Sequence, residues 1–238
     1  MRIEVAHRFH GPPTMGHGGY VAGLIAERLP GAVQVTLRRP TPLDRPLELV
    51  PAEGGGMQLL DGAQLLAEAV STTLQLAIPR SPSLAQAAAA EAGSPSLLGE
   101  RGVHPTCFGC SRLRAPGDGL RVFAGPCEVD GQRLVAARWT PGAAFADDAG
   151  RLRQVYALAA LDCAGAFAFI VDSVRAGLLG RIVLQQHHAA RADQELIVIG
   201  WQLGRDGKKL LAGTALLQAD GTLCAAAKAT WFPIEARR

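Results

Sequence analysis

Residues 152–174 read LRQVYALAALDCAGAFAFIVDSV, and this stretch decides the predicted fold because it is apolar on nearly every side. Its length and composition indicate a helix, and a helix without a polar face must be covered all round. The strand-like runs that follow it can supply that cover if they form a sheet curled around the helix. The last two runs are joined by Asp220-Gly221, a strong hairpin signal.

The first part of the chain repeats this plan with a helix followed by strands. Residues 18–29, GGYVAGLIAERL, carry apolar residues at helical spacing and stop before Pro30 and Gly31. Strand-like patterns continue on both sides of the chain's middle. In the first part they lie at residues 33–37, 47–50, 57–60 and 65–70, with a possible extension over 72–78. In the second part they lie at residues 120–123, 133–139, 181–186, 195–203, 209–218 and 222–231.

A segment rich in Ala, Ser, Pro and Gly separates the two parts. Residues 81–102 lack an alternating apolar pattern and are interpreted as a linker with a short helix in the alanine run. The predicted organisation is a first unit at 1–80, the linker at 81–102 and a second unit at 103–238. The predicted fold class is α+β, with two fused units that each wrap a helix in an antiparallel sheet.

The composition is that of an ordinary globular protein. Of the 238 residues, 48% are hydrophobic and 19% are charged, and the net charge of +3 gives no footprint of nucleic-acid binding. We expect a cytoplasmic protein without a membrane contact, because neither a signal peptide nor an apolar run of about 18 residues is present. The five cysteines are expected to be reduced thiols.

Several segments together resemble the double-hotdog acyl-CoA thioesterases of the hotdog-fold superfamily. Gly16-His17-Gly18-Gly19 resembles the helix start of that family, and Leu161-Asp162 resembles its acidic position. LRRPTPLDRPLEL (37–49), RADQEL (191–196) and LLAGTALLQADGTLCAAAKATW (210–231) resemble its strand beginnings and closing hairpin. The resemblance covers nearly the whole chain and implies the double-hotdog fold, an acyl-CoA substrate and a homodimer or higher homo-oligomer.

The family pattern places an acidic residue seven positions after the second glycine. Seven residues after Gly19 stands Ala26, so the first half has the glycines without the acid; seven residues before Asp162 stands Val155, so the second half has the acid without the glycines. The resemblance therefore implies one composite site, with Gly18 and Gly19 from one half and Asp162 from the other.

These residue types suit the hydrolysis of a thioester. Free N–H groups at a helix N-terminus can hold an oxyanion, and glycine allows the acyl group to approach closely. Asp162 is predicted to be catalytic, preferably as a general base for water, and burial would raise its pKa. The same features also have structural interpretations, as a turn into a helix and as a hydrogen-bonded core aspartate.

Further polar residues are candidates for substrate binding, namely His17, one of His187 and His188, Thr214 and Thr230. His17 could instead only cap the helix. Glu27, directly after the vacant acidic position at Ala26, is interpreted as a solvated residue rather than as a displaced acid. Arg38, Arg39, Arg112, Arg114 and Arg121 could contact CoA phosphates, although exposed arginines are common.

The main competing motif is His104-Pro-Thr-Cys107-Phe-Gly-Cys110. Its Cys-x-x-Cys spacing suits zinc, with His104 or Cys127 as conceivable further ligands, but a second ligand pair is missing from the sequence. We therefore interpret it as a tight turn, and predict no metal and no cofactor beyond the CoA of the substrate.

Two other functions remain to be weighed against acyl-CoA hydrolysis. A binding module without turnover would keep the pocket, and one of the two active-site copies already lacks its full residue set. A hotdog enoyl-CoA hydratase is disfavoured, because the Asp-x4-His pattern of that class does not occur in the chain.

Overall fold

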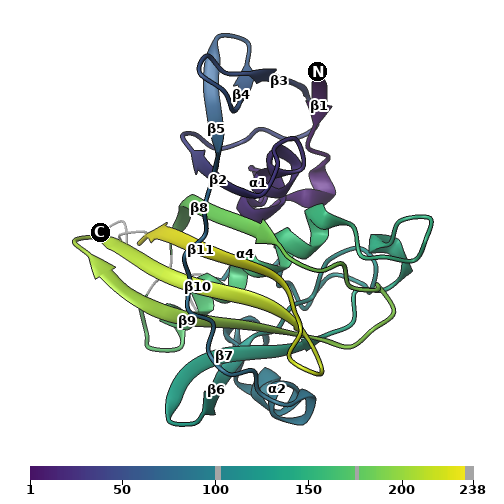
Figure 1. The fold of residues 1–238 in the computed structure, drawn as a ribbon, viewed down its shortest axis with the longest axis vertical. Coiled ribbons are helices and arrows are strands. Elements are labelled where there is room, and N and C mark those ends of the chain that lie inside the picture. The colour runs from purple at the N-terminus through teal and green to yellow at the C-terminus, as the bar shows by residue number, and fades with distance from the viewer. Residues whose placement is uncertain (100–102, 175–176, 234–238) are drawn as a thin grey trace.

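The computed structural model describes residues 1–99, 103–174 and 177–233, in which eleven strands form one antiparallel sheet. The strand order is β1-β3-β4-β5-β2-β8-β11-β10-β9-β7-β6 (Figure 1). The strands of the first half are β1 (Arg2–Glu4), β2 (Ala32–Leu37), β3 (Pro46–Pro51), β4 (Met57–Asp61) and β5 (Gln64–Thr72). Those of the second half are β6 (Gly125–Val129), β7 (Gln132–Trp139), β8 (Leu178–Gln186), β9 (Leu196–Asp206), β10 (Lys209–Gln218) and β11 (Leu223–Phe232).

The two halves of the sheet have the same topology. In each half a strand and a helix are followed by four strands, so that β1, α1 and β2–β5 match β7, α4 and β8–β11, and the second half adds β6 at its edge. In the first half β1 lies at one side and β2 at the other side, next to β5. In the second half β7 and β8 take these two places, with β8 next to β11. The halves meet where β2 pairs with β8 in antiparallel register, with Val35 opposite Ile182. The chain is therefore a fusion of two units that share one topology.

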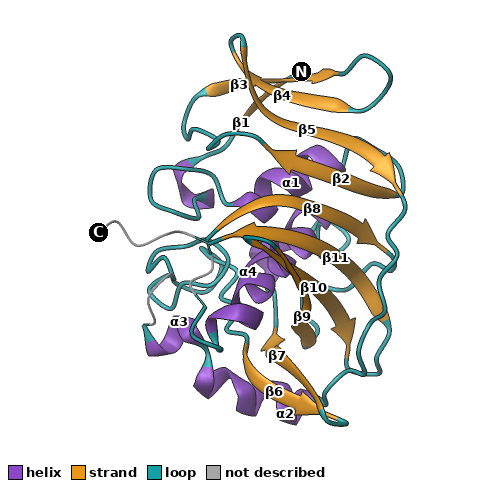
Figure 2. Cartoon of the chain, turned by 90° about the vertical axis from the view of Figure 1, so that its left-hand side faces the viewer, coloured by secondary structure: helices purple, strands orange, loops and turns teal. Residues whose placement is uncertain are grey.

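The two central helices, α1 (Gly18–Ala26) and α4 (Gln154–Ile170), lie against each other on the same side of the sheet (Figure 2). All residues of α4 after Gln154 are buried, as its uniformly apolar sequence predicts. The helix α1 is shorter than the predicted range of 18–29, because the chain turns at Glu27.

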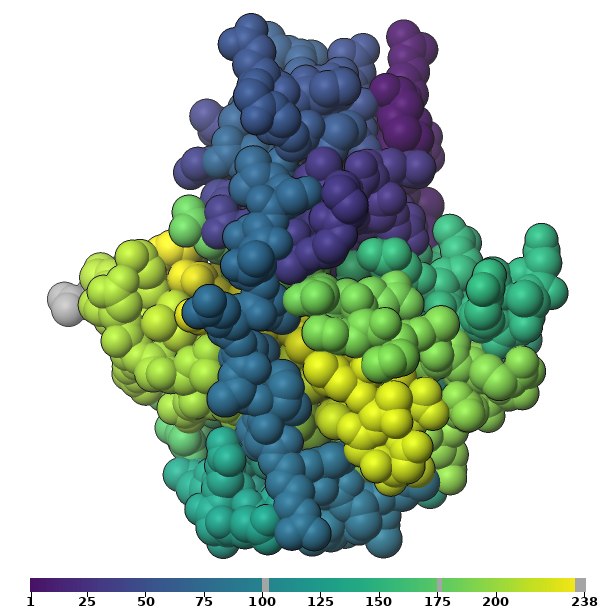
Figure 3. All heavy atoms as spheres, in the orientation of Figure 1, coloured from purple at the N-terminus to yellow at the C-terminus, as the bar shows by residue number. Residues whose placement is uncertain are grey.

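The opposite face of the sheet is covered by the middle of the chain. After β5 the backbone runs across the strands of the second half (Figure 3), and α2 (Leu84–Ala90) packs there against β6 and β7. The short helix in the alanine run is thus present, begun by a capping box of Ser83 and Gln86. The remaining short helices are η1 (His7–Phe9), η2 (Glu91–Gly93), α3 (Pro95–Leu98) and η3 (Ala143–Phe145). Residues 100–102 of the predicted linker lie outside the described residues.

Two strand predictions are wrong. Residues 120–123 are not a strand, because the N–H groups of Leu120 and Val122 donate to the carbonyls of Phe108 and Gly109 in a loop. Residues 73–78 do not extend β5; their apolar side chains, Leu76 and Ile78, pack on the outer face of the sheet instead. Both segments carry apolar residues at strand-like spacing, but no partner strand lies beside them in the described part of the chain.

None of the helices in the described ranges is long and apolar enough to cross a membrane.

Candidate functional site

A cavity of about 320 Å³ opens between the first turn of α1 and the middle of α4. Its walls are mostly apolar, with Leu37, Phe167, Leu179 and Trp231 among the lining side chains. The two halves of the chain contribute to it together, because α1 and β2 come from the first half and α4, β8 and β11 from the second. An apolar cavity with a few polar groups is the usual form of a small-molecule site.

The polar centre of the cavity wall joins Asp162 to the start of α1. Asp162 is 3% exposed, and its Oδ2 accepts a hydrogen bond of 2.6 Å from the backbone N–H of Gly19. A Cβ atom on residue 19 would lie 2.6 Å from the Cβ of Asp162, so only glycine allows this approach. The structure therefore brings together the glycine and the carboxylate that the sequence predicted as one composite site.

This contact corrects the predicted role of Gly19. Its N–H was expected to be free to hold an oxyanion, but it is directed at the Asp162 carboxylate and not at the cavity. Gly18, the first residue of α1, lines the cavity and is half-buried. Gly19 therefore positions the carboxylate, while Gly18 forms part of the cavity wall.

The second oxygen of the carboxylate, Asp162 Oδ1, is buried and has no hydrogen-bond partner among the described residues. Burial raises the pKa of the Asp162 carboxyl, although His17 and the Gly19 N–H act in the opposite direction. A carboxylate with one oxygen anchored and the other unsatisfied can accept a proton from a bound water or hydroxyl group.

His17 caps the helix that carries the glycines. Its Nδ1 accepts the Tyr20 N–H at 3.2 Å, and its Nε2 lies 3.4 Å from Asp162 Oδ2. The ring is 2% exposed and lines the cavity. Both alternatives for His17 therefore agree with its position, since it caps α1 and also faces the site.

Three buried cysteines complete the inner wall. The Sγ of Cys163 lies 3.5 Å from His17 Nε2 and 3.8 Å from the Sγ of Cys107, and Cys110 lines the same cavity. Hydrogen bonds from the thiols of Cys110 and Cys163 hold the pKa of Cys107 well below its ordinary value. The sequence could pair Cys107 with Cys110 but could not show that Cys163 and His17 reach them.

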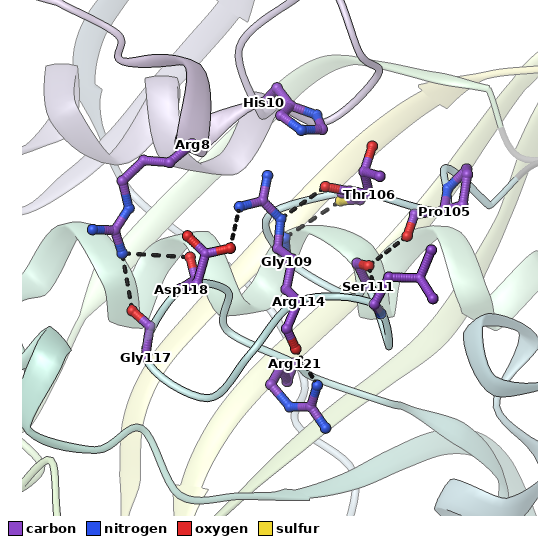
Figure 4. A network of polar contacts seen from close by, with 12 residues as sticks. Arg8, His10, Pro105, Thr106, Gly109, Ser111, Arg114, Gly117, Asp118 and Arg121 are labelled. Carbon is purple, nitrogen blue, oxygen red and sulfur yellow. Dashed lines mark hydrogen bonds and ion pairs between the residues drawn. The ribbon is translucent and has the colours of Figure 1, made fainter.

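Arginine side chains hold the loop that carries Cys107 in place. Arg114 donates to the carbonyl of Thr106 at 2.8 Å and pairs with Asp118 at 3.0 Å, and Arg8 donates to the carbonyl of Gly117 (Figure 4). The side chain of Arg114 is only 9% exposed.

Among the five arginines considered for CoA phosphates, the loop contacts assign Arg114 and Arg121 to structural roles. Arg121 donates to the carbonyls of Arg112 and Arg114, and none of these three residues lines the cavity. Arg38 and Arg39 do line it and are exposed at its rim, with Arg38 also paired to Glu68. Only these two arginines stand where a phosphate of a bound ligand could reach them.

Four other predicted substrate-binding residues are not brought to the cavity. The strand β8 ends at Gln186, so His187 and His188 lie beyond it and are exposed, and both N–H groups donate to the carbonyl of Cys224. Thr214 is fully buried beneath α4, against Gly165. Thr230 lies on β11 opposite Arg181, next to Trp231 but outside the cavity wall.

Trp231 is a cavity residue that sequence reasoning missed. Its Nε1 is buried and lacks a hydrogen-bond partner among the described residues, and the side chain lines the cavity. A tryptophan at the end of a predicted strand gives no signal of its facing, because a shift of one residue sends the side chain to the other face. The bulge between Thr230 and Trp231 makes such a shift here.

No protein-family model matches the sequence, and no curated protein matches it either. Solved structures do match. The tesB protein of Mycobacterium avium subspecies paratuberculosis aligns with a TM-score of 0.61 over 94% of this chain and 89% of its own, at 16% identity. A conserved protein of unknown function with a hot dog fold, from Alicyclobacillus acidocaldarius, gives 0.61 over 99% and 93%, at 14% identity.

The acyl-CoA thioesterase II TesB2 of Mycobacterium marinum aligns with a TM-score of 0.55 over 99% of this chain and 93% of its own, at 13% identity. These alignments span both halves and the sheet that joins them. They confirm the predicted fold: the chain is a double hotdog with the architecture of hotdog thioesterases.

Proposed function

We propose that this double-hotdog chain hydrolyses an acyl-CoA thioester at the composite site between its halves. The observation that supports this most directly is the geometry of Asp162. One carboxylate oxygen is anchored by the Gly19 N–H at 2.6 Å, and the other is buried without a partner at the wall of an apolar cavity. An anchored base beside a helix N-terminus is the combination that hydrolysis of a thioester needs.

In the proposed reaction the acyl carbonyl lies at the first turn of α1. Asp162 Oδ1 takes a proton from water, and the water oxygen attacks the carbonyl carbon. The oxyanion that forms is stabilised by the N–H of Gly18 and by the positive end of the helix dipole. The carbon–sulfur bond then breaks and the carboxylic acid is released. The CoA thiolate takes up the proton held by Asp162, which restores the ionised base.

The choice of a CoA ester rests on the rim of the cavity and on the fold. Arg38 and Arg39 stand at the opening, where their guanidinium groups can bind phosphates. The Mycobacterium marinum structure with the same architecture is named an acyl-CoA thioesterase II. CoA is part of the substrate here, and the hydrolysis uses no cofactor. A homo-oligomeric state and a cytoplasmic location remain predictions.

The alternative is a module that binds an acyl-CoA and does not turn it over. The second helix start, where Val155 replaces glycine, is the observation that favours it, because one of two related sites has already lost its residue set. This alternative predicts binding that is unaffected when Asp162 loses its charge.

Hydrolysis of a panel of acyl-CoA esters, followed by chromatographic detection of free CoA, distinguishes these functions. Asp162→Asn keeps an oxygen for the Gly19 N–H but removes the base, so we expect kcat to fall by about 10²–10⁴-fold. Glu27 accepts the N–H of Val155 at the start of α4, as Asp162 accepts that of Gly19 at the start of α1. Glu27→Gln is therefore the matched control and should retain turnover. An Asp162→Asn protein that hydrolyses at the wild-type rate would contradict the mechanism. Tight binding of CoA esters without any turnover would support the binding module.

A further inference from the structure

The inner wall of the cavity contains a cluster of soft metal ligands that the proposed hydrolysis does not use. His17 Nε2 and the Sγ atoms of Cys107 and Cys163 all lie within 4.8 Å of one another. The three residues are buried, with exposed fractions of 2%, 4% and 9%. They come from three separate segments, namely the residue before α1, the loop before β6 and the middle of α4.

Two distances in this cluster match edges of a zinc tetrahedron. With Zn–S bonds of about 2.3 Å and Zn–N bonds of about 2.0–2.1 Å, tetrahedral angles place two sulfurs about 3.8 Å apart and a nitrogen about 3.6 Å from a sulfur. The Cys107–Cys163 distance is 3.8 Å and the His17–Cys163 distance is 3.5 Å. The third distance, between His17 Nε2 and the Sγ of Cys107, is at most 4.8 Å, so small movements of the side chains let one ion contact all three atoms.

The loop around Cys107 has the form that holds a thiolate. The N–H of Gly109 donates to the Sγ of Cys107 at 3.3 Å, and such second-layer donors orient and stabilise metal-bound thiolates. A Cβ on residue 109 would lie 2.6 Å from His17 Nε2 and 2.7 Å from the Cys163 sulfur. Glycine at this position lets the loop reach the two ligands from the other segments.

Cys110 provides a fourth sulfur at the standard spacing. It follows Cys107 by three residues, is 3% exposed and lines the same cavity. Its Sγ is not one of the three atoms that lie within 4.8 Å of one another, so a turn of the Cys110 side chain is needed to bring it to the ion. A site with three cysteines and one histidine is a usual composition for structural zinc.

We propose that His17, Cys107, Cys110 and Cys163 bind one zinc ion, which ties the loop at residues 104–110 to the starts and faces of α1 and α4. The site is structural, because all four ligands belong to the protein and are buried. It fixes the wall beside Asp162 and joins the two halves of the chain. The sequence alone predicts no metal, because it does not show that His17 and Cys163 meet the Cys-x-x-Cys pair. Cys127, the further ligand considered there, lies on β6, away from the cluster.

Zinc binding changes the hydrogen bond that His17 makes at its other nitrogen. In the structure, Nδ1 accepts the Tyr20 N–H at 3.2 Å, the long end of the range for such bonds. Coordination of zinc through Nε2 would place the ring proton on Nδ1, which could then no longer accept this N–H. The cap of α1 and the ion therefore require different forms of the ring. A single neutral hydrogen bond contributes far less than coordination of a structural zinc ion, so the ion prevails when it is available.

Zinc content, measured by mass spectrometry of protein purified without chelators from zinc-supplemented cells, tests the proposal without an activity assay. We expect one zinc per chain in the wild type. Cys107→Ser, Cys110→Ser and Cys163→Ser should each lose most of it. His17→Asn should lose it as well while its side-chain oxygen can still cap α1, so this variant separates the ligand from the cap. Cys127→Ser is the matched control, since it removes a cysteine outside the cluster.

Two measurements on the wild-type chain keep the test decisive if a serine variant fails to fold. Titration of the thiols with a mercurial should release one zinc per chain, detected by a chromogenic chelator. Replacement of zinc by Co²⁺ should give the intense thiolate-to-cobalt absorption and the visible bands of a tetrahedral site. The proposal would be overturned if the wild-type protein contained no more zinc than a double variant that carries both Cys127→Ser and Cys163→Ser. A disulfide among these cysteines in freshly purified protein, found by intact-mass analysis, would overturn it too.

Discussion

The two helix starts of this double hotdog are related by the fold, and a carboxylate from the opposite half caps each of them. At α1, Asp162 accepts the N–H of Gly19 at 2.6 Å; at α4, Glu27 accepts the N–H of Val155 at 3.1 Å. Gly19 and Val155 occupy equivalent positions in the two halves. Each stands seven residues before the predicted acidic position, which is Ala26 in the first half and Asp162 in the second. The sequence predicted that Glu27 is a solvated residue. The second contact shows instead that its carboxylate binds the start of α4.

The surroundings of the two contacts differ in what fills the space beside them. At α1 the glycines leave room, and the cavity opens there. At α4 the side chain of Val155 is fully buried, and aromatic rings pack around the helix start. The ring centroids of Tyr20 and Tyr156 lie 6.1 Å apart, and those of Phe145 and Tyr156 lie 4.9 Å apart. The same backbone contact thus supports a site in one place and a packed core in the other.

The largest expected effect comes from closing the open helix start. Gly19→Ala places a methyl group where the Asp162 side chain stands, so the carboxylate must move. A displacement of about 1 Å in a catalytic group costs about 100-fold in rate, and we expect a decrease of that size in kcat/KM for an acyl-CoA substrate. Circular dichroism should show a folded protein. Wild-type activity in this variant would mean that the Gly19–Asp162 contact does not position the base.

The corresponding change at the filled helix start should affect stability instead. Val155→Ala removes buried methyl groups, and we expect a loss of about 1–3 kcal/mol in the free energy of unfolding, measured with denaturant. The kcat of the folded protein should stay near that of the wild type. A large fall in kcat would show that the two helix starts are not independent.

The pH dependence should distinguish the two carboxylates. Burial raises the pKa of Asp162, and the base must be ionised to act, so activity should fall about tenfold per pH unit below a midpoint that lies above the ordinary pKa of aspartate. The pH profile of kcat/KM measures this midpoint. Glu27→Gln should leave it in place, whereas the residual rate of Asp162→Asn should lack it.

The smallest expected effect is that of Glu27→Gln on stability. The amide oxygen can still accept the Val155 N–H, but the interaction of a negative charge with the helix N-terminus is lost. We expect a decrease of about 0.3–1 kcal/mol in the free energy of unfolding. Because this interaction is partly exposed, the difference from wild type should shrink in high salt. A difference that persists in high salt would show that the charge acts on something other than the helix end.

Much of the fold follows from local patterns. The apolar helix at residues 154–170 and the alternation of the strands after it require a sheet wrapped around a helix, and the same plan in the first half predicts the double hotdog. The runs at 73–78 and 120–123 show the limit of this reasoning. Their residues suit a strand, but a strand also needs a partner, and only the tertiary arrangement supplies or withholds one.

The sequence by itself determined which residues are chemically unusual: two glycines after His17, an aspartate in an apolar helix and a Cys-x-x-Cys pair. The tertiary structure alone decided how these groups are used. It directed the Gly19 N–H at Asp162, placed Glu27 on the other helix start, moved His187 and His188 away from the cavity and brought Cys163 and His17 to Cys107. The physical reason is that these contacts join residues from 56 to 146 positions apart, and their geometry depends on how α1 and α4 cross, which no local pattern encodes.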